Sequence, residues 1–121
     1  MNLTPVTRMA WAEIPREEVN AKLVRQAIHT AQMTVARLEM KAGGTVPSHS
    51  HHNAQFTMVQ SGSLRFLLGD GAEVIVGAGQ VLELPPHVQH GVEVLEDSVV
   101  IDLFTPRRDD WISGDDAYLR G

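Results

Sequence analysis

Short runs of apolar residues, separated by turn residues, recur along most of the chain. The apolar and polar positions within them alternate imperfectly, and the turns are rich in glycine, as at 61–62, 69–71 and 77–79. This combination is typical of short β-strands joined by tight turns. We predict strands at 22–30, 32–41, 55–60, 63–68, 73–76, 81–84, 90–95 and 98–104.

Evenly spaced short strands of this kind predict an all-β sandwich or barrel, with its core at about 22–106. The first 21 residues contain two prolines and are expected to form a loose lead-in, 1–21. The tail, 107–121, is expected to contain a short helical turn capped by Asp109 or Asp110. The sequence has no internal repeat, so 1–121 is predicted to form a single domain.

Composition and charge exclude several classes of function. Cysteine is absent, which excludes disulfides and thiolate metal sites. The net charge is −5 and the pI is about 5.6, which gives no basic footprint for nucleic acid. The first residues lack an apolar signal region, and no run approaches the roughly 20 apolar residues that span a bilayer. We therefore expect a cytoplasmic protein that binds neither nucleic acid nor membrane.

Two histidines at 49 and 51 are the first candidates for chemistry. In an extended segment His49 and His51 point to one face, roughly 6.5 Å apart along the strand. Their ring nitrogens can converge on one ion, because a metal–nitrogen bond measures about 2.0–2.1 Å. A turn at 52–54 would let the next strand fold back and direct Gln55 to the same point. Taken alone, such a histidine pair is also common by chance in polar surface loops.

A second stretch, 79–90, places His90 after a strand and a Pro-Pro turn. Together the two stretches resemble the paired motifs of the cupin superfamily, G-x5-H-x-H-x3-E-x6-G and G-x5-P-x-G-x2-H-x3-N. The matching positions are Gly43, His49, His51, Gln55, Gly62, Gly79, Pro85 and His90. The departures are Gln55 for glutamate, His87 for glycine and Val94 for asparagine.

The cupin resemblance implies a jelly-roll barrel, also called a double-stranded β-helix. It implies one divalent metal ion (Ni, Zn, Mn or Fe) held by His49, His51, Gln55 and His90. It also implies a homodimer, since paired cupin barrels commonly bury segments near their termini.

Asp102 is the most informative residue outside the two motifs, because it interrupts an otherwise apolar run at 99–104. An unpaired carboxylate buried there would cost several kcal/mol or raise its own pKa. Strand alternation puts Asp102 and Phe104 on the same face. From this residue alone a structural role is as open as a functional one: Asp102 could form an ion pair with Arg37 or Arg65 within the sheet, or lie at a sheet edge.

The segment HGVEVLEDSVVIDLFTPRRDDW, together with HSHHNAQ, resembles the KdgF proteins of pectin degradation over about 41–111. In that family glutamine in place of glutamate is itself typical. The resemblance implies conversion of 4,5-unsaturated uronate monosaccharides, released by pectin or alginate lyases, to linear keto sugars. It assigns catalysis to Asp102 and Phe104 and substrate binding to Arg108, with the four metal ligands named above.

The neutral ligand Gln55 bears on the type of reaction. Two histidines and a carboxylate are typical of iron oxygenases, whereas glutamine leaves a divalent ion with its full charge and favours an acidic sugar substrate. Two other functions stay open. One is a cupin dioxygenase acting on a small organic acid, and the other is a non-catalytic cupin that binds a small molecule.

Overall fold

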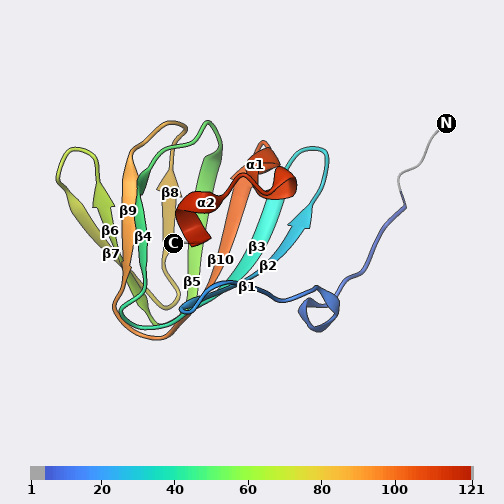
Figure 1. The fold of residues 1–121 in the computed structure, drawn as a ribbon, viewed down its shortest axis with the longest axis horizontal. Coiled ribbons are helices and arrows are strands. Elements are labelled where there is room, and N and C mark those ends of the chain that lie inside the picture. Colours follow the sequence, from blue (N-terminus) through green and yellow to red (C-terminus); the bar gives the residue numbers. More distant parts are fainter. Residues whose placement is uncertain (1–4, 121) are drawn as a thin grey trace.

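Two antiparallel β-sheets face each other in the computed structural model, which describes residues 5–120 (Figure 1). Within this range one sheet has the strand order β1-β2-β3-β10-β5-β8 and the other β4-β9-β6-β7. The strands are β1 (Glu17–Asn20), β2 (Leu23–His29), β3 (Thr34–Met40), β4 (Thr45–His49), β5 (Ala54–Ser61), β6 (Ser63–Leu68), β7 (Glu73–Gly77), β8 (Val81–Leu84), β9 (His90–Val94) and β10 (Ser98–Thr105). The helices are the 3-10 turn η1 (Trp11–Glu13), α1 (Asp109–Ser113) and α2 (Ala117–Arg120).

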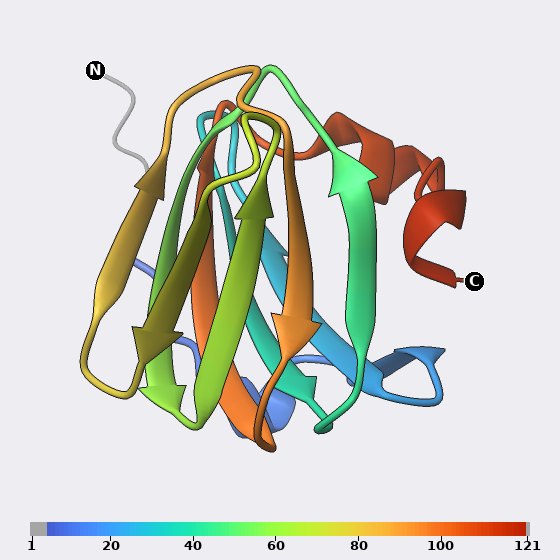
Figure 2. The same cartoon turned by 90° about the vertical axis from the view of Figure 1, so that its left-hand side faces the viewer.

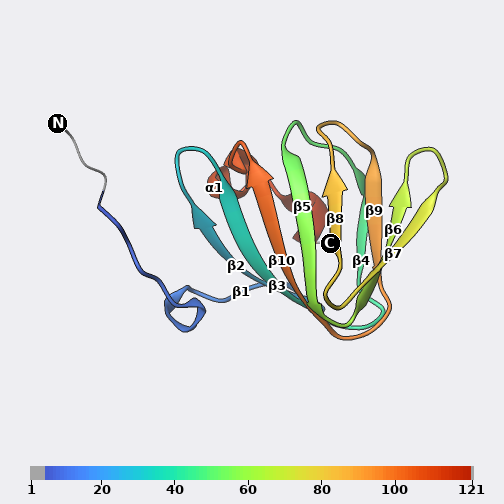
Figure 3. The same cartoon turned by 180° about the vertical axis from the view of Figure 1, so that it is seen from behind.

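The two sheets converge at one end and spread apart at the other (Figures 1 and 3). On one side the gap between them is crossed by α2, which contacts β1 and β4, an edge strand of each sheet (Figure 2). The predicted all-β jelly-roll architecture is confirmed. Residues 1–4 of the expected lead-in and Gly121 of the expected tail lie outside the described residues.

The core lies between the sheets and is built from alternate residues of each strand. Val59, Leu64, Phe66 and Val100 are at most 2% exposed and come from both sheets. The outward-facing residues between them are partly exposed, as expected for strands that have one face in the core and one in solvent. Burial of these side chains is the main force that holds the two sheets together.

Alternation along β10 decides which polar groups face the space between the sheets. Asp102 and Phe104 are both on its buried face. Asp102 lies opposite Thr57 on β5, and Phe104 lies opposite Gln55. The register of one strand pair therefore brings an acid, a hydroxyl, an amide and an aromatic ring to the same inward surface.

Two strands were not among those expected from the sequence. β1 falls within the expected lead-in, and its sequence EEVN has one apolar residue, Val19, to signal a strand. β4 is the extended segment that the first histidine motif requires, but its sequence TVPSH contains Pro47 and has no clear alternation. The other eight strands coincide with the expected runs to within a few residues.

The tail does form helical turns, but the expected cap is wrong. Arg108 occupies the N-cap position of α1 and makes no side-chain capping hydrogen bond. Asp109 and Asp110 lie in the first turn, where carboxylates interact favourably with the helix dipole. α1 ends at Gly114, whose φ of 81° is the left-handed conformation that stops many helices. None of the helices in the described part of the chain has the length and apolar character needed to cross a bilayer.

Two phenylalanines on consecutive strands, one in each sheet, test the assignment of inward and outward faces. Phe66 on β6 is 1% exposed, whereas Phe56 on β5 is 42% exposed. Phe66→Ala should lower the free energy of unfolding by about 3–5 kcal/mol, because it leaves a cavity in the core. Phe56→Ala should lower it by less than about 1 kcal/mol. Urea denaturation measures both, and equal losses would contradict the assignment.

Candidate metal centre

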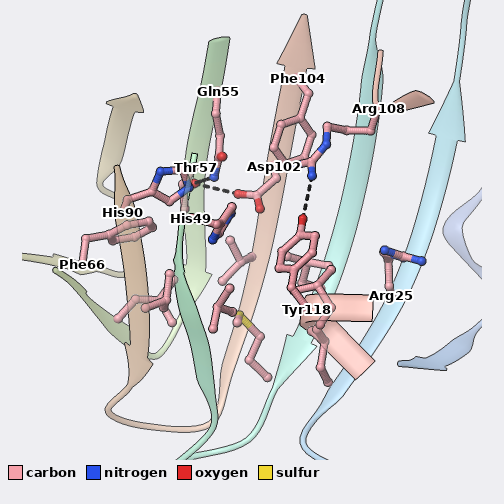
Figure 4. A pocket seen from close by; sticks show the side chains of 18 of the residues that line it. Arg25, His49, Gln55, Thr57, Phe66, His90, Asp102, Phe104, Arg108 and Tyr118 are labelled. Atoms are coloured by element: carbon pink, nitrogen blue, oxygen red, sulfur yellow. Dashed lines mark hydrogen bonds between the residues drawn. The ribbon is translucent and has the colours of Figure 1, made fainter. Parts of the chain in front are cut away.

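Three histidines meet between the sheets. His49 ends β4 and His90 begins β9, and the pairing of these strands sets the two residues opposite each other (Figure 4). His51 lies just beyond β4, with its ring centroid 5.6 Å from that of His49 and 5.1 Å from that of His90. One ligand atom of each histidine lies within 4.8 Å of those of the other two, so the group could hold a metal ion.

Each ring is held by a backbone carbonyl at its Nδ1 atom. The carbonyl oxygens of Pro47, Val88 and Asn53 lie 2.7, 2.8 and 3.0 Å from Nδ1 of His49, His90 and His51, respectively. A carbonyl oxygen only accepts, so each Nδ1 must carry the proton and donate it. Each Nε2 is then left with a free lone pair, which is the form that binds metal.

The three imidazoles are also kept neutral. Burial lowers the pKa of His49 and of His51, and it lowers the pKa of His90 to about 4. Metal ligation needs the neutral ring, and a ring that is already neutral at pH 7 releases no proton when it binds an ion. The site is therefore prepared for a cation by both ring orientation and protonation state.

Gln55 adds an oxygen to this group. Its Oε1 lies 3.0 Å from Nε2 of His51, and its Nε2 donates to the Thr57 hydroxyl at 2.9 Å. Since His51 is protonated at Nδ1, two acceptor lone pairs face each other across this short distance. Two ligands at right angles around an ion, each bonded at about 2.1 Å, stand about 3.0 Å apart. The spacing fits a shared cation and is unfavourable without one.

Thr57 connects Gln55 to Asp102. Its hydroxyl donates to Oδ1 of Asp102 at 2.7 Å (Figure 4). Asp102 is 7% exposed, and this burial raises its pKa to about 6, against the smaller opposing effects of the Thr57 hydrogen bond and the charge of Arg108. A carboxyl group with such a pKa can take up and release a proton near neutral pH.

Neither structural role considered for Asp102 describes it. Arg37 pairs with Glu39 at 2.9 Å, and Arg65 pairs with Glu93 at 2.9 Å. β10 lies inside its sheet, between β3 and β5, and not at an edge. Asp102 instead lines the cavity beside the histidines.

Arg108 lies against the cavity, but most of its guanidinium already has partners. Its Nε and Nη2 donate to the Asp110 carboxylate at 3.0 and 2.8 Å, and Nη2 also donates to the Tyr118 hydroxyl at 2.6 Å. Its Cζ lies 4.8 Å from the centroid of the Phe104 ring and 4.6 Å from that of Trp111. Among the described residues Nη1 makes no hydrogen bond, so it is the nitrogen left for a ligand.

These residues surround one cavity of about 60 Å³. It holds a few water molecules, each of which needs roughly 10–15 Å³. Its polar end carries His49, Gln55, His90 and Asp102, and the aromatic rings of Phe104, Trp111 and Tyr118 form part of its wall. The structure thus brings together all the site residues expected from sequence.

The residues that line the cavity also include several that the sequence analysis did not assign to the site, among them Arg25, Thr57, Trp111 and Tyr118. The position of Thr57 could have been predicted, because it lies two residues after Gln55 on the same strand face. Arg25 lies within a predicted strand, where a charged side chain ordinarily faces solvent, but it is buried and pairs with Asp116 at 2.7 Å. Trp111 and Tyr118 follow Arg108 in the tail, but they belong to no motif or strand pattern that would place them against the histidines.

A family model described as a cupin domain matches residues 36–104, more than half of the chain. A search of curated proteins finds no match. Among solved structures, KdgF from Halomonas sp. is 31% identical, with a TM-score of 0.76, over 83% of this chain and 94% of that one. An RmlC-like cupin from Shewanella frigidimarina NCIMB 400 is 25% identical, with a TM-score of 0.78, over 85% and 93%. The polyketide cyclase RemF from Streptomyces resistomycificus is 18% identical, with a TM-score of 0.73, over 84% and 80%, which shows a shared fold.

Metal content tests the histidine group directly, and the chain offers a matched control. His51→Ala removes a ring whose nitrogen faces the group, whereas the adjacent His52 is exposed. We expect purified His51→Ala to lose its bound metal and His52→Ala to retain the wild-type content. Elemental analysis of the three proteins gives the answer, and full occupancy in His51→Ala would exclude the site.

Thr57 should affect the metal affinity of the site although its side chain is not one of the candidate ligands. Thr57→Val keeps the shape of the side chain but removes the hydroxyl that holds the Gln55 amide. Loss of such a supporting contact typically weakens metal binding about 10–100-fold. Thr57→Ser keeps the hydroxyl and should bind within a few-fold of wild type. Titration of the metal-free proteins with Zn²⁺ measures the affinities, and equal values for the valine and serine variants would show that the hydroxyl has no such role.

Proposed function

The chain belongs to the cupin family, and within that family we propose that it is a metal-dependent isomerase of 4,5-unsaturated uronate monosaccharides. It would convert these products of pectin or alginate breakdown to linear keto sugars. The observation that carries the proposal is the hydrogen-bonded series Gln55–Thr57–Asp102, which links a candidate metal ligand to a buried carboxylate inside the cavity. The similarity to a KdgF protein at 31% identity supports it.

We assign the metal to His49, His51, His90 and Gln55. All four donors are neutral, so a bound divalent ion keeps its full charge. Nitrogen and oxygen donors of this kind suit Ni, Zn, Mn and Fe, and they do not form the all-oxygen shell that calcium prefers. When bound, the ion supplies a Lewis acid for the carboxylate and ring oxygen of the substrate.

The reaction moves a proton and transfers no electrons to or from the substrate. Ring opening breaks the bond between C1 and the ring oxygen, while the hydroxyl on C1 loses its proton and becomes an aldehyde. The ring oxygen remains on C5 as an enolate, with the double bond between C4 and C5. A proton added at C4 then converts the enolate to a ketone. The proton lost equals the proton gained, so the product is an isomer of the substrate.

Asp102 is the residue we assign to this proton transfer. With a pKa of about 6 it is mostly ionised at pH 7 and can still accept a proton readily. Its Oδ1 is held by Thr57, and its Oδ2 makes no hydrogen bond among the described residues. One oxygen is therefore fixed, and the other is left for the substrate.

Phe104 and Arg108 would shape the rest of the substrate site. The Phe104 ring packs edge-on against His51, with centroids 5.7 Å apart, and limits where a sugar ring can lie. Nη1 of Arg108 can donate to an anionic oxygen.

A second candidate is a cupin that oxidises or binds a small organic acid with an apolar part. It is favoured by the inner end of the cavity, which is lined by Leu23, Leu38, Met40, Leu64, Val92 and Val100. A dioxygenase would consume oxygen when given its substrate, whereas the isomerase would not. A non-catalytic binding protein would convert nothing.

Asp102→Asn tests the proposal most sharply among single variants. It keeps the size and hydrogen bonding of the side chain but cannot exchange a proton. Turnover, followed as loss of the conjugated absorbance of an unsaturated uronate, should fall about 10²–10⁴-fold. Metal content and melting temperature should stay near wild type, and the exposed Asp115→Asn should retain full activity.

The pH dependence of wild-type activity should report the ionisation of Asp102. kcat/KM should rise with pH through an acid limb at or below about 6, because the ionised form of Asp102 accepts the proton and a bound cation lowers its pKa further. A stable, metal-loaded Asp102→Asn protein with normal turnover would contradict the assignment of Asp102 to the proton transfer.

A further inference from the structure

The C-terminal segment, 109–120, is held firmly across one side of the cavity. Asp116 is fully buried and pairs with the buried Arg25 at 2.7 Å. Arg120 bonds the same carboxylate at 3.0 Å, and Asn20 donates to the carbonyl of Leu119 at 2.7 Å. These contacts fix α2 between the edge strands β1 and β4, so that the intervening Tyr118 has a defined place.

Tyr118 lies at the metal-binding group itself. Its ring centroid is 4.8 Å from that of His49, and its side chain lines the same cavity as Gln55, His90 and Asp102 (Figure 4). Its sequence position gave no hint of this, because it is far from both histidine motifs.

The hydrogen bonds of the Tyr118 hydroxyl leave its proton unused. Its oxygen accepts from Nη2 of Arg108 at 2.6 Å and, more weakly, from Nε1 of Trp111 at 3.5 Å. A phenol oxygen has two lone pairs and one O–H donor. Both acceptor positions are taken, and among residues 5–120 the O–H finds no acceptor. A donor left over inside a cavity has a ligand oxygen or water as its remaining partner.

We propose that Tyr118 is a substrate-binding residue whose hydroxyl donates a hydrogen bond to an oxygen of the ligand held at the metal centre. Arg108 and Trp111 act as positioning residues, because by filling the lone pairs they turn the proton toward the ligand. The charge of Arg108 also makes the hydroxyl a stronger donor. The identity of the ligand as a sugar acid rests on the proposed function. The C-terminal segment would then do more than cover the cavity, since it delivers a group that selects ligands with an acceptor oxygen at this point.

Binding of D-galacturonate, a saturated sugar acid that lacks the C4–C5 double bond and so cannot be converted to the keto sugar, tests the inference. Tyr118→Phe removes the hydroxyl and keeps the ring against His49. Calorimetric titration of the metal-loaded proteins should give a Kd about 3–10-fold higher for Tyr118→Phe than for wild type, the loss typical of one neutral hydrogen bond. Ile112→Ala, an exposed change in the same segment, should bind as wild type. Metal content and melting temperature should be unchanged in both variants.

Turnover of an unsaturated uronate by wild type, measured in parallel, decides the proposed function separately. If wild type binds D-galacturonate and Tyr118→Phe binds it equally well, the role of Tyr118 is wrong whether or not turnover occurs. If wild type does not bind D-galacturonate, the inference is wrong for sugar acids. A weaker Tyr118→Phe complex without wild-type turnover supports the binding role and rejects the isomerase.

Discussion

One threonine hydroxyl determines which atom of Gln55 faces the three histidines of the candidate metal centre. Thr57 donates to Asp102, and since a hydroxyl has a single proton, it can only accept from Gln55. The Gln55 amide must therefore turn its nitrogen toward Thr57 and its oxygen toward His51. An ionised Asp102 thus fixes, through two hydrogen bonds, which atom of Gln55 is presented to a cation. The strand register that sets Asp102 opposite Thr57 makes this possible, so the site depends directly on the pairing of β5 with β10.

The same logic applies to the histidines, whose carbonyl partners leave every Nε2 with a lone pair facing the group. Bringing these lone pairs and the Gln55 oxygen together is unfavourable until a cation joins them. The fold bears this cost through the packing of its two sheets around Val59, Leu64, Phe66 and Val100, as functional sites commonly do. A group prepared in this way would bind an ion with little rearrangement, and its neutral donors would leave the ion with its full charge.

The sequence predicted what depends on local spacing. Strand alternation and glycine turns located eight strands, and the residue spacing of the two cupin motifs identified His49, His51, Gln55 and His90 as candidate ligands. It did not predict what depends on distant contacts. β1 shows little alternation. The predicted cap of α1 was wrong, and the Asp110 carboxylate binds the Arg108 side chain instead. Tyr118 reaches His49 only because α2 crosses between the sheets. Such contacts arise from tertiary packing, and no short-range pattern encodes them.

The most direct test of the account is an NMR spectrum of a 4,5-unsaturated galacturonate monomer incubated with the metal-loaded protein in air. The account predicts that the vinyl proton signal at C4 disappears faster than without protein and that a CH₂ signal replaces it, with the molecular mass unchanged. A product that has gained oxygen would identify an oxygenase. A vinyl signal that persists as long as it does without protein would contradict the proposed isomerase.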